Sequence, residues 1–206
     1  MMRLHNGIGE VSVSAPVLAL RLVASASLVA ILAIWQGEAL MAHLLGPILM
    51  AIDLIDHNHA VRVLRIDHVG ADTVIYMKAG IRELIVTGSQ VTFADPRAEA
   101  VVTTPFGAFL IAPSILLTLV LGWPARNYRA WALRLLVMAP LAAALFAIDA
   151  PFVLDAYLWE LHRDAHAPDA TSPILAWKAF LAQGGRFVLG GLAALTCLAP
   201  TFRHGP

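Results

Sequence analysis

The sequence predicts an α-helical membrane protein with four transmembrane helices and a small extracytoplasmic antiparallel β-segment after the first helix. Hydrophobic residues make up 59% of the 206 residues and charged residues 14%, whereas soluble domains have roughly 45–50% and about 25%. The charges also leave four apolar stretches near the roughly 20 residues that a spanning helix needs. These two observations exclude an ordinary soluble domain.

The first span is expected at about Ala15–Trp35, where Arg21 is the only charge. Residues 1–35 therefore form an N-terminal tail and an anchor. No convincing cleavage site of small residues follows the apolar run, so we expect the anchor to be retained.

Residues 36–104 are expected to lie outside the membrane. Leucines and isoleucines recur every three or four positions over 38–55, which predicts an amphipathic helix on the membrane surface or an outward extension of the first helix kinked at Pro47. The alternative makes 39–55 a second span in a tight hairpin and places the next segment in the cytoplasm.

Short β-branched runs then alternate with turn residues and predict a four-stranded meander over 60–69, 73–78, 84–87 and 90–94. A sheet of about 45 residues is too small to be stable alone. Its apolar face must rest on the chain's own helices, on the membrane or on another protein.

The last three spans fall within 105–206, at Pro105–Leu121, Ala130–Ala150 and about Phe180–Pro200, with an outer loop over 151–171. Thr104 before Pro105 and Ser172 before Pro173 each predict a helix N-cap followed by proline in the first turn.

Orientation follows from the arginines near the helix ends. The connection 122–129 carries Arg126 and Arg129 and no acid, so the positive-inside rule places it in the cytoplasm. Both termini are then cytoplasmic. The tryptophans agree, because they favour the membrane interface and all lie near predicted helix ends: Trp35, Trp123, Trp131, Trp159 and Trp177.

The composition limits the partners and cofactors that the sequence predicts. Basic and acidic residues number 14 each, so no net positive charge favours nucleic acid, and a single cysteine excludes an internal disulfide. No phosphate loop or catalytic motif is present, and no cofactor is predicted. The candidate metal ligands are four outer histidines, His57, His59, His162 and His166. Their spacings are common by chance, so we expect solvated loop histidines instead.

Arginines inside spans need an explanation. We expect the Arg134 side chain to extend to the headgroups. Arg186 shares a helical face with Gly190 and Ala194, a spacing of small residues that suits close helix packing. We expect its partner to be Asp149 or Asp155.

Two short motifs flank the second span: Thr104-Pro105-Phe106-Gly107 before it and Trp123-Pro124-Ala125-Arg126 after it. With the N-terminal anchor and the outer β-segment, they resemble the small membrane proteins associated with exosortases, in particular the exosortase H-associated membrane proteins. The resemblance implies an accessory in the bacterial inner membrane that sorts surface proteins beside a larger exosortase-like enzyme. Exosortases use an outer cysteine, arginine and histidine, whereas Cys197 is predicted on the inner side, so no catalytic residue carries over.

The first functional prediction is therefore a non-enzymatic accessory that presents its β-segment to a partner protein in surface-protein sorting or assembly. One alternative is an extracytoplasmic metal-binding protein or membrane enzyme that uses the outer histidines. Another is a small transporter subunit, although Ser114 and Thr118 are the only polar residues of the second span. The sequence predicts no particular oligomeric state.

Overall fold

The computed structural model describes residues 14–83, 85–87, 90–92, 98–125, 127–166 and 168–203. The tail before Ser14, Arg126 and the side chain of His166 lie outside the described part. The elements in chain order are α1 (Ala15–Ile55), β1 (His59–Val69), β2 (Asp72–Ile81), β3 (Ile85–Thr87), β4 (Gln90–Thr92), β5 (Ala100–Pro105), α2 (Gly107–Gly122), α3 (Tyr128–His166), α4 (Pro173–Phe180), the π-helical turn η1 (Leu181–Gly185) and α5 (Arg186–Arg203).

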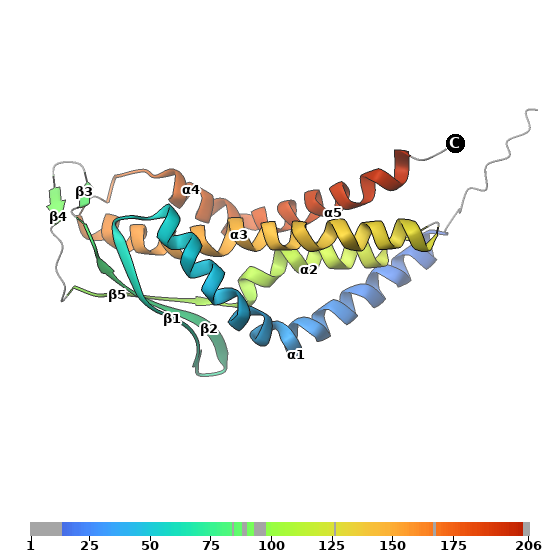
Figure 1. Ribbon diagram of the computed structural model, residues 1–206, viewed down its shortest axis with the longest axis horizontal. Coiled ribbons are helices and arrows are strands. Elements are labelled where there is room, and N and C mark those ends of the chain that lie inside the picture. The colour runs from blue at the N-terminus through green and yellow to red at the C-terminus, as the bar shows by residue number, and fades with distance from the viewer. Residues whose placement is uncertain are drawn as a thin grey trace, which may run out of the picture.

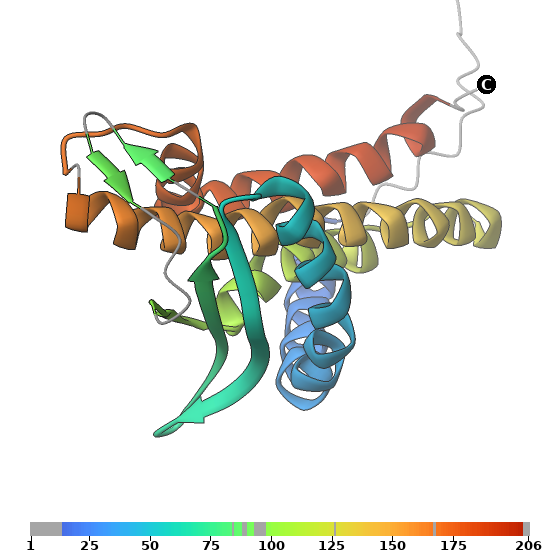
Figure 2. The same ribbon diagram turned by 60° about the vertical axis from the view of Figure 1, so that its left-hand side comes forward.

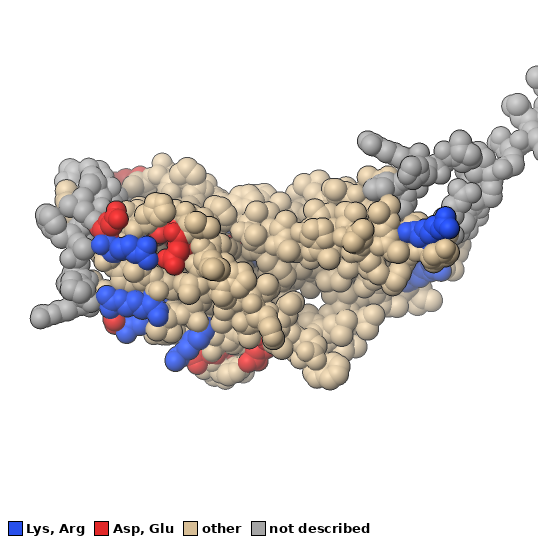
Figure 3. All heavy atoms as spheres, viewed as in Figure 1, with Lys and Arg blue, Asp and Glu red and all other residues tan. Residues whose placement is uncertain are grey.

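Three helices are long and apolar enough to cross a membrane: α1, α3 up to Ala165, and the run Pro173–Ala199, which is kinked at Gln183 and Gly184. The fourth apolar helix, α2, has 16 residues. Figure 3 shows charges of both signs at the sheet end of the visible face and only Lys and Arg at the far end, with an uncharged belt between them. These features fit an α-helical, membrane-embedded protein.

The first helix continues well past the predicted span. The apolar stretch 15–35 and the periodic segment 38–55 form one 41-residue helix that contains Pro47. This helix changes direction near its middle, so its second half leans toward the sheet (Figure 1). The segment is therefore an extension of the first helix.

The sheet differs from the predicted meander. Its order is β1-β2-β5, and all pairs are antiparallel, while the runs predicted as third and fourth strands form a separate hairpin, β3–β4. Thr104 and Pro105 are the last residues of β5, and α2 starts only at Gly107. The N-cap predicted at Thr104 is thus wrong. An edge strand tolerates proline, and pairing with Ile75 holds Thr104 extended.

One face of the sheet packs on the chain's own helices. Ile75 and Met77 of β2 are fully buried in a cluster with Ile52 of α1 and Leu154 and Leu158 of α3. In Figure 2 the sheet lies beside the second half of α1 and below the C-terminal half of α3. The helices therefore supply the surface that so small a sheet needs.

The third helix runs through Pro140 and Pro151 to His166, so the predicted connection 151–171 is helical over most of its length. Val153, Leu154 and Leu158 bury against the sheet and α1, which explains why the helix persists outside the apolar stretch. We call the assembly of the second half of α1, the sheet and residues 151–166 of α3 the cap.

Candidate functional site

The site begins where α1 ends. Asp56 is the C-cap of α1, and its backbone N–H donates to the Ile52 carbonyl at 2.8 Å. Its carboxylate accepts the Asn58 N–H at 2.8 Å through Oδ1 and contacts the Nδ1 of His59 at 2.5 Å through Oδ2. One side chain therefore turns the chain out of the helix and fixes the first residue of β1.

Asp155 of α3 completes the cluster. One candidate ligand atom from each of Asp56, His59 and Asp155 lies within 4.8 Å of the other two. The three residues are 3%, 4% and 1% exposed. The Oδ1 atom of Asp155 is buried and has no hydrogen-bond partner among the described residues. Two carboxylates and an imidazole thus converge in a dry place, with one oxygen unsatisfied.

Two carboxylates buried close together repel each other when both are ionised. Burial raises the pKa of Asp56, but hydrogen bonds from His59 and Asp155 and the charge of His59 outweigh burial and hold that pKa at about 2. Two carboxylates this close cannot both ionise unless a cation lies between them. Asp155 must therefore either keep its proton or share a cation with Asp56.

The Trp159 side chain contacts both His59 and His162. The Trp159 ring meets the His59 ring edge-on at a centroid distance of 5.8 Å and the His162 ring at 6.0 Å. Asp155, Trp159 and His162 follow one another at four and three positions along α3, so they share one helical face. The cap thus presents one polar and aromatic stripe of α3 to the start of β1.

Asp155 also lines an open cleft between α3 and α4. The cleft has a volume of about 590 Å³ and is walled by Ile55, Phe152, Ile174 and Trp177. Trp177 Nε1 donates to the Ile148 carbonyl at 3.0 Å and fixes that wall. A molecule could therefore approach the buried cluster from this side.

The donor set suits a divalent metal. Imidazole together with carboxylates and without thiolate is typical of zinc and of other divalent transition metals. A dication would take the place of the proton between His59 and Asp56 and would use the unpaired Asp155 oxygen. It would also cancel both carboxylate charges, which removes most of the cost of burying them. The other arrangement of the same groups is a proton-sharing network without metal.

The four predicted histidines separate in the structure. His59 joins the cluster, while His57 is exposed two residues away. His162 is buried and contacts Trp159, and the His166 side chain is outside the described part. The carboxylates of Asp56 and Asp155 were not predicted as ligands. Two sequence features could have indicated the cluster. They are the polar Asp-His-Asn-His turn and the helical spacing of Asp155, Trp159 and His162.

A second buried polar group lies on the membrane side of the cap. Arg186 donates to Asp149 through Nε at 2.7 Å and through Nη2 at 2.8 Å, and its guanidinium lies 5.5 Å from the centre of the Phe109 ring. Asp149 is thus the partner of Arg186. Along the same helix face, a Cβ at Gly190 would come 2.6 Å from the Ala112 carbonyl oxygen of α2, and Ala194 is 1% exposed. The helices therefore approach very closely on this face.

Arg134 bonds within the chain at the end of α2, and its expected contact with the headgroups stays a prediction. Its side chain is 3% exposed, and Nη1 donates to the carbonyls of Trp123 and Pro124 at 3.0 and 3.1 Å. The last carbonyls of a helix lack partners within the helix. Arg134 satisfies groups of this kind just after α2.

The outward face of the sheet is mixed, with charged pairs beside the exposed Val63 and Val101. Lys78 and Arg62 both pair with Glu99, at 2.6 and 3.2 Å, and Arg65 lies over the Tyr76 ring at 5.0 Å. The apolar face is covered by α1 and α3. An exposed apolar sheet face, the feature that would best support docking of a partner, is not found among the described residues.

Comparisons of the chain with protein-family models, with curated proteins and with solved structures found no match. The resemblance to exosortase-associated proteins therefore stays a prediction from short motifs.

Proposed function

We propose that this protein is a four-pass protein of the bacterial inner membrane that binds a divalent metal ion, zinc first, at Asp56, His59 and Asp155 in an extracytoplasmic cap. The observation that carries the proposal is the buried meeting of two carboxylates and an imidazole within 4.8 Å, with the Asp155 Oδ1 atom unpaired. On the visible face, only Lys and Arg appear at the end far from the sheet, which supports the orientation (Figure 3).

Three protein ligands leave a zinc ion at least one open position. The cleft beside Asp155 lies where such a position could be reached. The proposal covers binding alone, and we assign no reaction to the site.

The accessory role expected from the sequence stays a separate proposal. A partner would have to use the outer edges of β1 and β5 or the outward face, since the sheet's apolar face is covered.

The test is a zinc titration of chelator-treated protein in detergent, followed by calorimetry. We expect one zinc per chain in the wild type. Asp155→Asn and His59→Gln should each weaken binding by more than the roughly 10–100-fold that outer-shell substitutions cost.

Two matched substitutions serve as controls. His57→Gln changes an exposed histidine two residues from the site, and Asp53→Asn changes an exposed carboxylate that pairs with Arg82. Both should bind zinc like the wild type, and thermal unfolding of the metal-free variants confirms that each is folded. A wild type without stoichiometric zinc would overturn the proposal. Equal losses in His57→Gln and His59→Gln would do the same.

A further inference from the structure

The cleft between α3 and α4 has the size and lining of a small-molecule site. Its volume is about 590 Å³, within the roughly 300–1,000 Å³ of such sites. Its walls are mostly apolar, and three of the side chains are aromatic: Phe152, Trp159 and Trp177. Among the described residues that line it, Asp155 is the one charged group. A ligand here would therefore meet one carboxylate in an apolar and aromatic setting.

Asp155 has no lysine or arginine partner in the described part of the chain. The basic side chains that follow it on α3 and on α4 pair with other acids, Arg163 with Asp164 and Lys178 with Glu160. Asp155 is 1% exposed, and its Oδ1 atom makes no hydrogen bond with the described residues. A cationic donor that entered from the cleft would satisfy this atom.

These walls match an organic cation better than an anion or a purely apolar molecule. An ammonium group has three N–H donors, and its hydrogen bond to a carboxylate is charge-assisted. The faces of tryptophan and phenylalanine rings attract cations as well. An anion would be repelled by Asp155 and by the neighbouring Asp56, and an apolar molecule would leave the Asp155 oxygen unpaired.

We infer that this cleft binds a small primary ammonium ion with an apolar body. The ammonium N–H donates to Asp155 Oδ1, and the body packs against Phe152 and Trp177. Ser172, the N-cap of α4, makes no capping hydrogen bond and adds a second polar group to the lining. The inference does not rest on the metal proposal. A zinc ion would use the same Asp155 oxygen, however, so the two ligands should compete.

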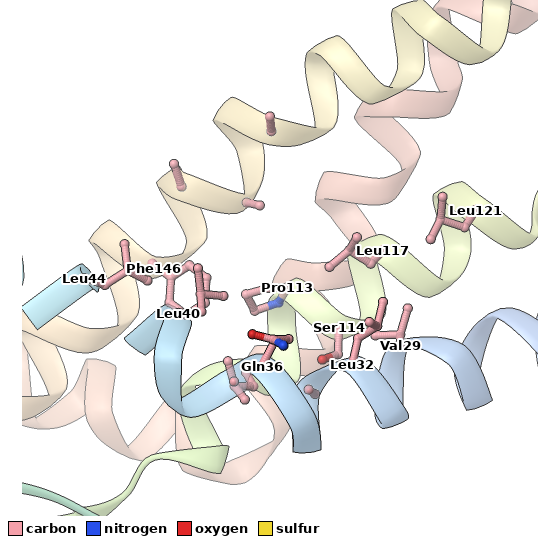
Figure 4. Close-up of a pocket in the computed structure, with 16 residues that line it drawn as sticks. Val29, Leu32, Gln36, Leu40, Leu44, Pro113, Ser114, Leu117, Leu121 and Phe146 are labelled. Carbon is pink, nitrogen blue, oxygen red and sulfur yellow. The ribbon is translucent and has the colours of Figure 1, made fainter. Parts of the chain in front are cut away.

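The cavity between α1, α2 and α3 differs from the cleft in its charge. It has a volume of about 470 Å³, and no charged side chain is among the described residues that line it. Gln36 and Ser114 are the polar side chains labelled there in Figure 4. An apolar probe could enter either space, so a preference for an ammonium over its neutral counterpart reports on the cleft.

The test is a calorimetric titration of the metal-free protein in detergent with phenethylammonium and with phenethyl alcohol, its neutral counterpart. The same titrations into protein-free detergent correct for uptake by micelles. The wild type should bind phenethylammonium roughly tenfold or more tightly than the alcohol, the effect of one hydrogen bond to a charged group. Asp155→Asn should remove that preference.

A matched pair of substitutions on α4 tests the location. Ile174 lines the cleft, whereas Ala176 is exposed and does not line it. Ile174→Trp should fill the cleft and abolish binding of phenethylammonium, and Ala176→Trp should leave it unchanged. Ile148→Trp, also in the lining, repeats the test if Ile174→Trp fails to fold.

Equal affinity of the wild type for the two probes would overturn the inference. So would unchanged binding in a folded Ile174→Trp, or a preference for the ammonium that survives Asp155→Asn. Simultaneous binding of zinc and phenethylammonium would also contradict it, because both need the Asp155 oxygen.

His59→Gln separates this inference from the metal proposal, because His59 is a proposed zinc ligand that does not line the cleft. This variant should lose zinc and keep phenethylammonium. A wild type that binds phenethylammonium but no zinc would support this inference and overturn the metal proposal. A wild type that binds zinc but, when metal-free, shows no preference for the ammonium would overturn this inference alone.

Discussion

Asp155 is the residue on which the chemistry of the cap depends. A buried carboxylate oxygen without a partner is rare, because leaving it unpaired costs free energy. Asp155 Oδ1 has no partner, although Asp56 and His59 lie within 4.8 Å. If this position served only to pack the core, an apolar residue would be more stable there than an aspartate. A metal ion bound to this oxygen would explain why an aspartate is buried here.

Arg186 and Asp149, unlike Asp155 Oδ1, are buried polar groups that satisfy each other. Both side chains are at most 10% exposed and the contact is bidentate, so removing one partner leaves a buried charge unpaired. Asp149→Asn or Arg186→Met should each lower the free energy of unfolding by about 3–5 kcal/mol. Denaturant unfolding in detergent measures the loss.

The control is Asp164→Asn, which breaks the exposed pair with Arg163 and should cost less than about 1 kcal/mol. The double exchange Asp149→Arg with Arg186→Asp should recover part of the lost stability. A single substitution as mild as the control would show that the pair does not stabilise the helices.

Residue patterns predicted some of these partners and missed others. Arg186 was an arginine on a face of small residues near two acids, so a protein partner could be expected. Asp56 and Asp155 could not be joined from sequence, because 99 positions separate them and only the packing of α3 on the sheet brings them together.

At the scale of elements, the junction η1 between α4 and α5 depends on a glycine with a positive φ. Gly184 has φ +106° and ψ 3°, a conformation that residues with a Cβ rarely adopt. Gly184→Ala should therefore lower the free energy of unfolding by about 1–3 kcal/mol. The measurement is again denaturant unfolding in detergent.

Gly191, on the regular helix α5, supplies the comparison. A Cβ there meets no atom within 4 Å, so Gly191→Ala should be neutral or stabilise by up to about 1 kcal/mol. If both alanines had the same effect, the positive φ at Gly184 would not be required by the fold.

Element types were predictable where one periodicity dominates. The apolar stretches gave the helices, and Ser172 with Pro173 marked the start of α4 correctly. Thr104 and Pro105 were predicted to start a helix, because Thr-Pro is a common helix start. Pairing with β2 keeps these two residues in a strand instead. The length of α3 was missed because its last four turns lie beyond the apolar stretch and are held by burying Val153, Leu154 and Leu158 against the sheet and α1.

The whole molecule has its mixed charges at one end and Lys and Arg alone at the visible far end. The proposed topology places the cap outside and the connection between α2 and α3 inside. In a Cys197→Ser background, Asp72→Cys in the cap should react with an impermeant maleimide on spheroplasts. Asn127→Cys should react only after the membrane is opened. Both positions are exposed in the structure.

The opposite pattern would invert the proposed topology and place the sheet in the cytoplasm. That result would leave the geometry of the cap unchanged, but it would place the metal site in the reducing compartment.

The most direct test of the metal site is an X-ray absorption spectrum at the zinc edge of the zinc-loaded protein. Asp56, His59 and Asp155 predict a first shell of nitrogen and oxygen at roughly 2.0–2.2 Å with the signature of one imidazole. They also predict no sulfur at about 2.3 Å, and Asp155→Asn should abolish the signal of protein-bound zinc. A sulfur scatterer, two or more imidazoles, or an unchanged spectrum in Asp155→Asn would contradict the assignment.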